Sequence, residues 1–233
     1  MTDDRPTGFQ RARSAEQREI RKQAILDAAT ELLGELPVSE ISLRELSRRV
    51  GLSKTNVVRY FETREAVFFE LLNRSLEGWI EELSAELAER AERAERAEAD
   101  AADAADTEAV TALLARSLGR RSLLCDLISA LGSELERNIS AGAVREFKLA
   151  HVRLLGELAD LLRRHLTGLT PSTARELVSL TVVCTAGLWP FAHPSDAVAE
   201  AQLDPGLADT KVDFAERLGR ILHIAVTGML ALH

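Results

Sequence analysis

The chain has 233 residues, of which 46% are hydrophobic and 28% charged, and its formal net charge is −8 at pH 7. This composition is typical of a soluble globular protein, and the length allows one large core or a small domain joined to a larger one. No run of apolar residues reaches the roughly 18 that a membrane span requires. The opening MTDDRPTGFQRARS lacks the apolar core of a secretory signal, so we expect a cytoplasmic protein.

The residue types favour helix throughout. Ala, Leu, Glu and Arg dominate, whereas only six prolines and thirteen glycines interrupt the chain. No alternation of Val, Ile and Thr persists as it would in strands. The sequence therefore predicts an all-α fold.

Charge is distributed unevenly between the two parts of the chain. Residues 1–64 contain 12 basic and 10 acidic side chains, a net of +2, and the remainder contains 17 and 27, a net of −10. Within 42–64 the count is 6 basic against 2 acidic. Because binding depends on the field at the contacting face, an acidic protein can still present a local basic surface to a polyanion.

The first predicted unit is a flexible arm over residues 1–15, followed by a helix over 16–33. Arg11 and Arg13 of the arm are candidates for entering a DNA minor groove. The alternative is that both are disordered residues that serve only solubility. Gly34 and Pro37 end the helix.

Two short helices joined by a glycine follow. Ser42 is placed to cap a helix ending near Val50, with Glu45 completing a capping-box pattern. Gly51 turns the chain, and Ser53 caps a helix over 54–61. This layout predicts a helix-turn-helix within residues 16–62.

The third helix has an inward and an outward face. Val57 and Phe61, four residues apart, share the inward face. The side chains that then point away from the core suit base edges and phosphates, and they are Lys54, Thr55, Val58 and Arg59.

Residues 63–233 are expected to form a second, larger helical domain. A fourth helix begins near Thr63, and the low-complexity segment 88–106 is predicted to be a solvated spacer, with a partner-binding surface as the alternative. The last two long helices are apolar over much of their circumference, which predicts a subunit interface. Further helices are expected over 107–118, 120–137, 143–167, 171–189 and 209–231, with a short one near 195–202 between Pro190, Pro194 and Pro205.

The segment SLRELSRRVGLSKTNVVRYFETREAVFFELL resembles the N-terminal DNA-binding signature of the tetracycline-repressor (TetR) family across roughly residues 18–72. The resemblance implies transcriptional repression, a double-stranded DNA operator, a small-molecule effector bound in the C-terminal domain, and a homodimer through helices near 171–189 and 209–231. It assigns base reading to Lys54, Thr55, Val58 and Arg59. It assigns phosphate binding to Ser42, Ser53, Asn56, Tyr60 and Arg64.

Several positions depart from the family pattern. Thr55 stands where Gly or Ala is common, Val58 where Tyr is common, and Glu62 where Pro is frequent. Val58 can contact a thymine methyl group but cannot hydrogen-bond to a base, so sequence preference cannot be copied from relatives. Glu35-Leu36-Pro37 replaces the usual Gly-aromatic pair after the first helix.

Aromatic or polar residues on otherwise apolar helices are candidates for the effector pocket, although each is also compatible with a plain core or surface position. No phosphate-binding loop, nucleophile elbow or paired acid and base of motif quality is present, and we expect no enzyme activity. The pocket candidates are Trp79, Cys125, Glu134, Phe147, His151, Trp189 and Phe191.

Neither a metal nor an organic cofactor is expected. The five histidines never pair at helical spacing or join a carboxylate in a ligand pattern. Cys125 and Cys184 lie far apart and are interpreted as two small buried thiols, with a redox switch or disulfide as the alternative.

The sequence thus predicts a dimeric, ligand-responsive DNA-binding regulator, most simply a repressor of a palindromic operator. A helical protein-interaction module that uses residues 88–106 is the alternative, and a helical enzyme is a more distant one.

Overall fold

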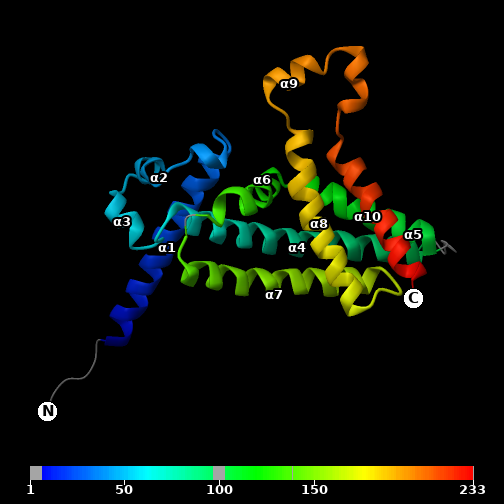
Figure 1. Cartoon of the computed structure of the whole chain (residues 1–233). Helices are drawn as coiled ribbons and strands as arrows, with labels where there is room; N and C mark the ends of the chain where they lie inside the picture. Colours follow the sequence, from blue (N-terminus) through cyan, green and yellow to red (C-terminus); the bar gives the residue numbers. More distant parts are fainter. Residues whose placement is uncertain (1–6, 97–102, 138, 233) are drawn as a thin grey trace.

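The computed structural model describes residues 7–96, 103–137 and 139–232, and every regular element in them is helical. This confirms the all-α prediction. Four elements form the N-terminal unit at one end of the molecule (Figure 1). They are α1 (Thr7–Leu33), the 3₁₀ turn η1 (Val38–Glu40), α2 (Leu43–Val50) and α3 (Lys54–Val58).

The remaining helices form a bundle around the long helix α4, which packs against α5, α6 and α7 (Figure 1). Helix α8 packs across α6 and α7, and α10 lies along α5. The segment that contains α9 stands away from the bundle. The elements are α4 (Arg64–Arg96), α5 (Asp103–Gly119), α6 (Ser122–Ala130), the π-helical turn η2 (Leu131–Leu135), α7 (Ala141–His165), α8 (Pro171–Ala192), α9 (Asp196–Ala201), the 3₁₀ turn η3 (Pro205–Thr210) and α10 (Phe214–Ala231).

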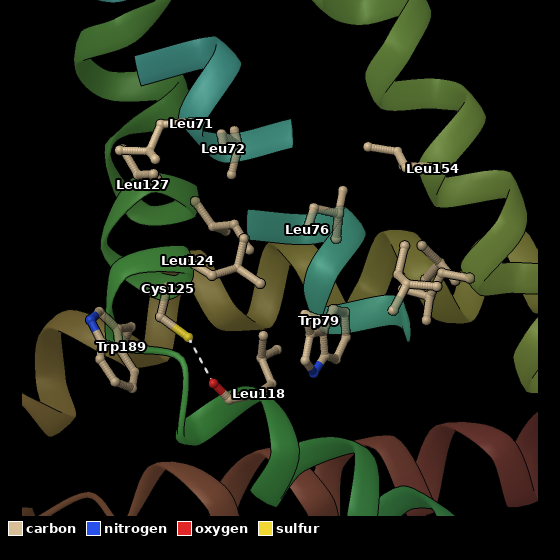
Figure 2. Close-up of a cluster of buried hydrophobic side chains, with 14 of the residues drawn as sticks. Leu71, Leu72, Leu76, Trp79, Leu118, Leu124, Cys125, Leu127, Leu154 and Trp189 are labelled. Atoms are coloured by element: carbon tan, nitrogen blue, oxygen red, sulfur yellow. Dashed lines mark hydrogen bonds between the residues drawn. The ribbon is translucent and has the colours of Figure 1, made fainter. Parts of the chain in front are cut away.

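Apolar side chains from five helices fill the centre of the bundle. Figure 2 shows α4 contributing Leu72, Leu76 and Trp79 to a cluster that α5, α6, α7 and α8 complete. Trp79 Nε1 donates to Ser117 Oγ at 3.1 Å, so the indole is buried with its polar atom satisfied. The same core extends into the N-terminal unit through Phe68 and Val67, both fully buried.

The ends of several helices differ from the sequence predictions. Helix α1 begins at Thr7, nine residues before the expected start, although the side chains of Arg11 and Arg13 lie outside the described residues. The helix expected over 120–137 changes at Leu131 into a wider π turn, which keeps Leu135 fully buried. Pro190 lies within the last turn of α8 instead of ending the helix.

The segment 88–106 is largely helical where it is described. Residues up to Arg96 continue α4, and α5 begins at Asp103, before the expected start at 107; residues 97–102 lie outside the described part. Arg96 pairs with Glu92 at 2.8 Å, and Arg93 Nε donates to the backbone oxygen of Glu89. An ion pair between Arg90 and Asp106 joins α4 to α5.

Shortening a fully buried α4 side chain tests the shared core. We expect Leu72→Ala to lower the free energy of unfolding by about 2–5 kcal/mol, because the bundle cannot collapse fully around the missing atoms. Leu149→Ala on α7 removes the same atoms from a side chain that is 58% exposed and should change stability by less than about 0.5 kcal/mol. Urea unfolding at one fixed protein concentration measures both, and equal effects would contradict the described core.

Candidate nucleic-acid interface

The turn between α2 and α3 depends on one glycine. Gly51 has φ of 70°, in the left-handed region that glycine adopts without steric cost. Its N–H donates to Arg48 O at 3.2 Å, and Leu52 N donates to Ser47 O at 3.0 Å, which satisfies the last carbonyls of α2. The chain is thereby redirected straight into α3.

Serine caps hold the N-terminal ends of both short helices. Ser42 Oγ accepts from Glu45 N at 3.1 Å, and Ser53 Oγ accepts from Asn56 N at 3.2 Å. The expected capping box at α2 does not form, because the Glu45 carboxylate pairs with Arg48 instead of turning back to the cap. Both serines are exposed, so each places a hydroxyl beside the positive end of a helix, where anions bind.

Helix α3 is shorter than predicted but keeps the predicted faces. It ends at Val58, with Arg59 as its C-cap, instead of continuing to residue 61. Val57 is fully buried and Phe61 is 5% exposed, and their burial contributes about 1.5–3 kcal/mol each to holding the helix in place. The four predicted base-reading side chains, Lys54, Thr55, Val58 and Arg59, are all exposed.

The predicted phosphate contacts Asn56 and Tyr60 face α1 across a groove of about 570 Å³. The Arg18 guanidinium carbon lies 5.8 Å from the centre of the Tyr60 ring, and Arg18 Nη2 donates to Arg59 O at 3.4 Å. Arg21 lines the same groove. Sequence reasoning missed these two α1 arginines, although their spacing of three residues places them on one helical face.

Arg64 has a structural role that the sequence does not reveal. Its Nη1 donates to Val38 O at 3.0 Å and Ile41 O at 2.8 Å, and its Nε donates to Glu65 at 2.8 Å. The first residue of α4 therefore holds the η1 segment in place. Its assignment to phosphate binding stays a prediction.

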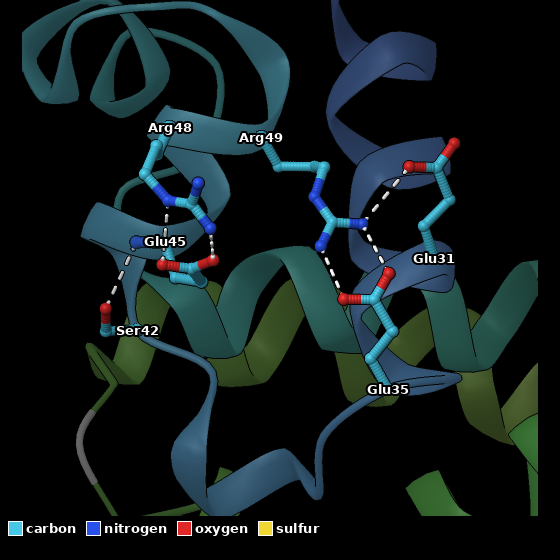
Figure 3. Close-up of polar contacts among 6 residues, drawn as sticks. All are labelled: Glu31, Glu35, Ser42, Glu45, Arg48 and Arg49. Carbon is cyan, nitrogen blue, oxygen red and sulfur yellow. Dashed lines mark hydrogen bonds and ion pairs between the residues drawn. The ribbon is translucent and has the colours of Figure 1, made fainter.

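Ion pairs engage several of the basic residues in 42–64. Arg49 binds the Glu35 carboxylate at 2.6 and 2.9 Å and Glu31 at 3.4 Å, which ties α2 to the end of α1 (Figure 3). The hydrogen bonds from Arg49 lower the pKa of Glu35. Across the described part of the chain, the side chains of Arg44, Lys54 and Arg59 form no ion pair, so unpaired positive charge remains on α2, on α3 and at the C-cap of α3.

The predicted effector-pocket residues do not gather around one cavity. On α7, Phe147 stacks on Phe69 with centroids 4.0 Å apart, and His151 stacks on Phe147 at 5.0 Å. His151 Nδ1 lies 2.9 Å from Asn73 Oδ1, and burial lowers the pKa of His151. Phe147 lines a cleft of about 390 Å³ that also includes Phe61.

The other candidates lie elsewhere. Trp79 and Cys125 are enclosed in the core, where Cys125 Sγ donates to Leu118 O at 3.4 Å and burial raises the pKa of the thiol. Trp189 Nε1 donates to Asp126 at 2.6 Å, whereas Phe191 is 69% exposed. Glu134 lines a cleft of about 600 Å³, here called the junction cleft, whose other lining residues include Leu36, Val38, Asp126 and Ala130.

The remaining sequence predictions concern metals, thiols and membranes. No group of three or more His, Cys, Asp or Glu side chains within the described ranges is placed to hold a metal ion. Cys125 and Cys184 are both free thiols, the first buried and the second partly buried. Among the helices described, none combines the length and apolarity needed to cross a membrane.

Two family models together match most of the chain. Residues 25–71 match bacterial regulatory proteins of the tetR family, and residues 73–233 match the tetracyclin repressor-like C-terminal domain. The chain belongs to the TetR family. The match confirms the resemblance drawn from 18–72 and makes the protein a transcriptional regulator of this family, which agrees with the expectation that it is not an enzyme.

Individual relatives are more distant. The HTH-type transcriptional regulator RutR of Escherichia coli K12 is 32% identical over 65 residues, which are 28% of this chain and 31% of RutR. A TetR transcriptional regulator from Rhodococcus sp. RHA1 aligns over 93% of this chain and 98% of its own length, with 15% identity and a TM-score of 0.51, and this likeness shows the fold alone. A TetR-family regulator from Streptomyces coelicolor aligns over 90% of this chain and 99% of its own, with 21% identity and a TM-score of 0.49.

The turn glycine gives a sharp test of this TetR-family unit. Space is open around a Cβ built on Gly51, so Gly51→Ala should cost only the left-handed backbone strain, about 1–2 kcal/mol. Gly78→Ala, a matched change inside α4 where the added Cβ also meets nothing, should stabilise by about 0.5–1 kcal/mol. Urea unfolding checks the two opposite signs, and a neutral Gly51→Ala would rule out the described turn.

Proposed function

We propose that this TetR-family protein is a ligand-responsive repressor that binds a palindromic DNA operator as a homodimer in the bacterial cytoplasm. One observation carries the proposal. Helix α3 presents Lys54, Thr55, Val58 and Arg59 to solvent while Val57 fixes the opposite face in the core. A short helix anchored on one face and polar on the other fits the DNA major groove.

The surroundings of α3 supply phosphate contacts. The exposed hydroxyls of Ser42 and Ser53 lie at the positive ends of α2 and α3. Asn56 and Tyr60 line the groove between α3 and α1, and Arg18 adds a cation from α1. Phosphate contacts of this kind set affinity and orientation, whereas Lys54, Thr55, Val58 and Arg59 contact base edges.

Helices α8 and α10 are the proposed dimer interface. They pack against each other, and each leaves a large β-branched side chain exposed, Val183 at 65% and Ile224 at 64%. A second copy that covers these residues would place two α3 helices on one face of a two-fold dimer. An effector that favours another dimer geometry would then release the operator.

Removing either unpaired cation of α3 tests the DNA contacts. Lys54→Ala and Arg59→Ala should each weaken binding to the upstream intergenic DNA of the gene by about 1–3 kcal/mol, because each loses a base contact. Lys211→Ala removes an exposed lysine from the segment before α10 and should leave the affinity unchanged. Fluorescence anisotropy over a salt series measures all three. Wild-type affinity in both α3 variants, or a binding constant independent of salt, would contradict the proposal.

The dimer has its own test. Ile224→Glu places a charge in the proposed interface and should shift the protein to monomers in sedimentation velocity, with loss of operator binding. Val152→Glu alters a side chain on α7 that is 67% exposed and should leave the assembly intact. If Ile224→Glu sediments as the wild type does, α10 is not the interface.

A further inference from the structure

The junction cleft lies where three parts of the molecule meet. The segment after α1 supplies Leu36 and Val38, α6 supplies Ala130, and Pro190 closes it from the end of α8. Contact between α6 and η1 brings the first two walls together. The volume of about 600 Å³ lies within the range of about 300–1,000 Å³ of small-molecule sites.

Charge in the junction cleft has one sign. Its lining residues include the acidic Glu35, Asp126 and Glu134 and the hydroxyl-bearing Ser129 and Ser133, and no Lys, Arg or His is among them. The C-terminal end of α1 also opens onto it at Leu33 and Gly34, and a helix C-terminus carries partial negative charge. A cleft with apolar walls and several negatively charged residues fits a ligand that has an apolar body and a cationic group at one end.

Asp126 is the acidic residue best placed to bind the cationic group of such a ligand. It lies on α6 and is only partly exposed, and one of its oxygens accepts from Trp189 Nε1 at 2.6 Å, which fixes its orientation. Burial raises the pKa of Asp126, and the Trp189 hydrogen bond opposes this. A bound ammonium would compensate the desolvated carboxylate and gain more than it would from an exposed one.

We propose that the junction cleft binds an organic amine, with its ammonium on Asp126 and its apolar body against Leu36, Val38 and Ala130. This site is distinct from the aromatic cleft beside Phe147 and from the filled core around Trp79. The claim that this amine acts as the effector rests on the proposed function, whereas the claim that the cleft binds an amine does not.

The same cleft has a direct connection to the DNA-binding unit. Glu35 lines it and also forms the two shortest bonds to Arg49 of α2 (Figure 3). A cation held on Asp126 in the same cleft attracts the Glu35 carboxylate and so weakens its bonds to Arg49. Loss of the Arg49 bonds loosens α2 from α1 and so disturbs the position of α3 that operator binding requires.

Binding is tested with three probes that share one apolar body: 4-phenylbutylammonium, 4-phenylbutanol and 4-phenylbutanoate. Calorimetry on the full chain should give about tenfold tighter binding of the ammonium than of the alcohol, and the carboxylate should bind most weakly. Asp126→Asn should remove the preference for the ammonium, whereas Asp160→Asn, on the exposed face of α7, should keep it. Equal affinity for the three probes, no binding of the ammonium, or an unaffected Asp126→Asn variant would overturn the proposal.

Coupling is tested with a matched pair of glutamates. Glu31 and Glu35 both bind Arg49, but only Glu35 lines the cleft. The ammonium probe should weaken operator binding of the wild type and of Glu31→Gln, and should have no effect on operator binding of Glu35→Gln. A Glu35→Gln variant that responds like the wild type would overturn the coupling. If the protein without probe fails to bind the operator, the proposed function is contradicted, whereas the calorimetry still decides whether the junction cleft binds an organic amine.

Discussion

The first turn of α4 is the point on which the two halves of the molecule depend. Arg64 hydrogen-bonds to the carbonyls of Val38 and Ile41, so the connection between α1 and α2 is fixed to a helix of the bundle. One turn later Val67 and Phe68 are fully buried in the core that both halves share. A helix that contributes to two packed units transmits a tilt from one to the other, because close-packed cores do not deform continuously.

This arrangement also explains how an acidic chain presents a basic face. Much of the positive charge in 42–64 is used internally: Arg48 binds Glu45, Arg49 binds Glu35, and Arg64 holds backbone carbonyls. These pairs place the short helices but contribute little to the external field. Within the described ranges, Arg44 on α2, Lys54 on α3 and Arg59 at its C-cap form no ion pair, so the field that a phosphate backbone meets is decided by a few residues and not by the net charge of −8.

The sequence predicted the features that local chemistry determines, and missed those that tertiary contacts determine. Gly51, Ser42 and Ser53 act within a few residues of themselves, so their turn and caps could be predicted. Arg64 could not be placed, because its acceptors lie 23 and 26 residues earlier. Side-chain type likewise made Trp79 and Trp189 pocket candidates but gave no information on shared cavities, which depend on how whole helices pack.

Glu35 stands at a position where the sequence departs from the family pattern, and the structure gives a physical reason for the difference. The usual Gly-aromatic pair would supply no charge there, whereas Glu35 binds Arg49 on one side and lines the junction cleft on the other. A carboxylate that is 57% exposed can exchange partners at small cost, since solvent screens an exposed ion pair and it adds little stability. The weak Glu35–Arg49 ion pair is therefore better suited to being displaced by a bound cation than to holding α1 and α2 together permanently.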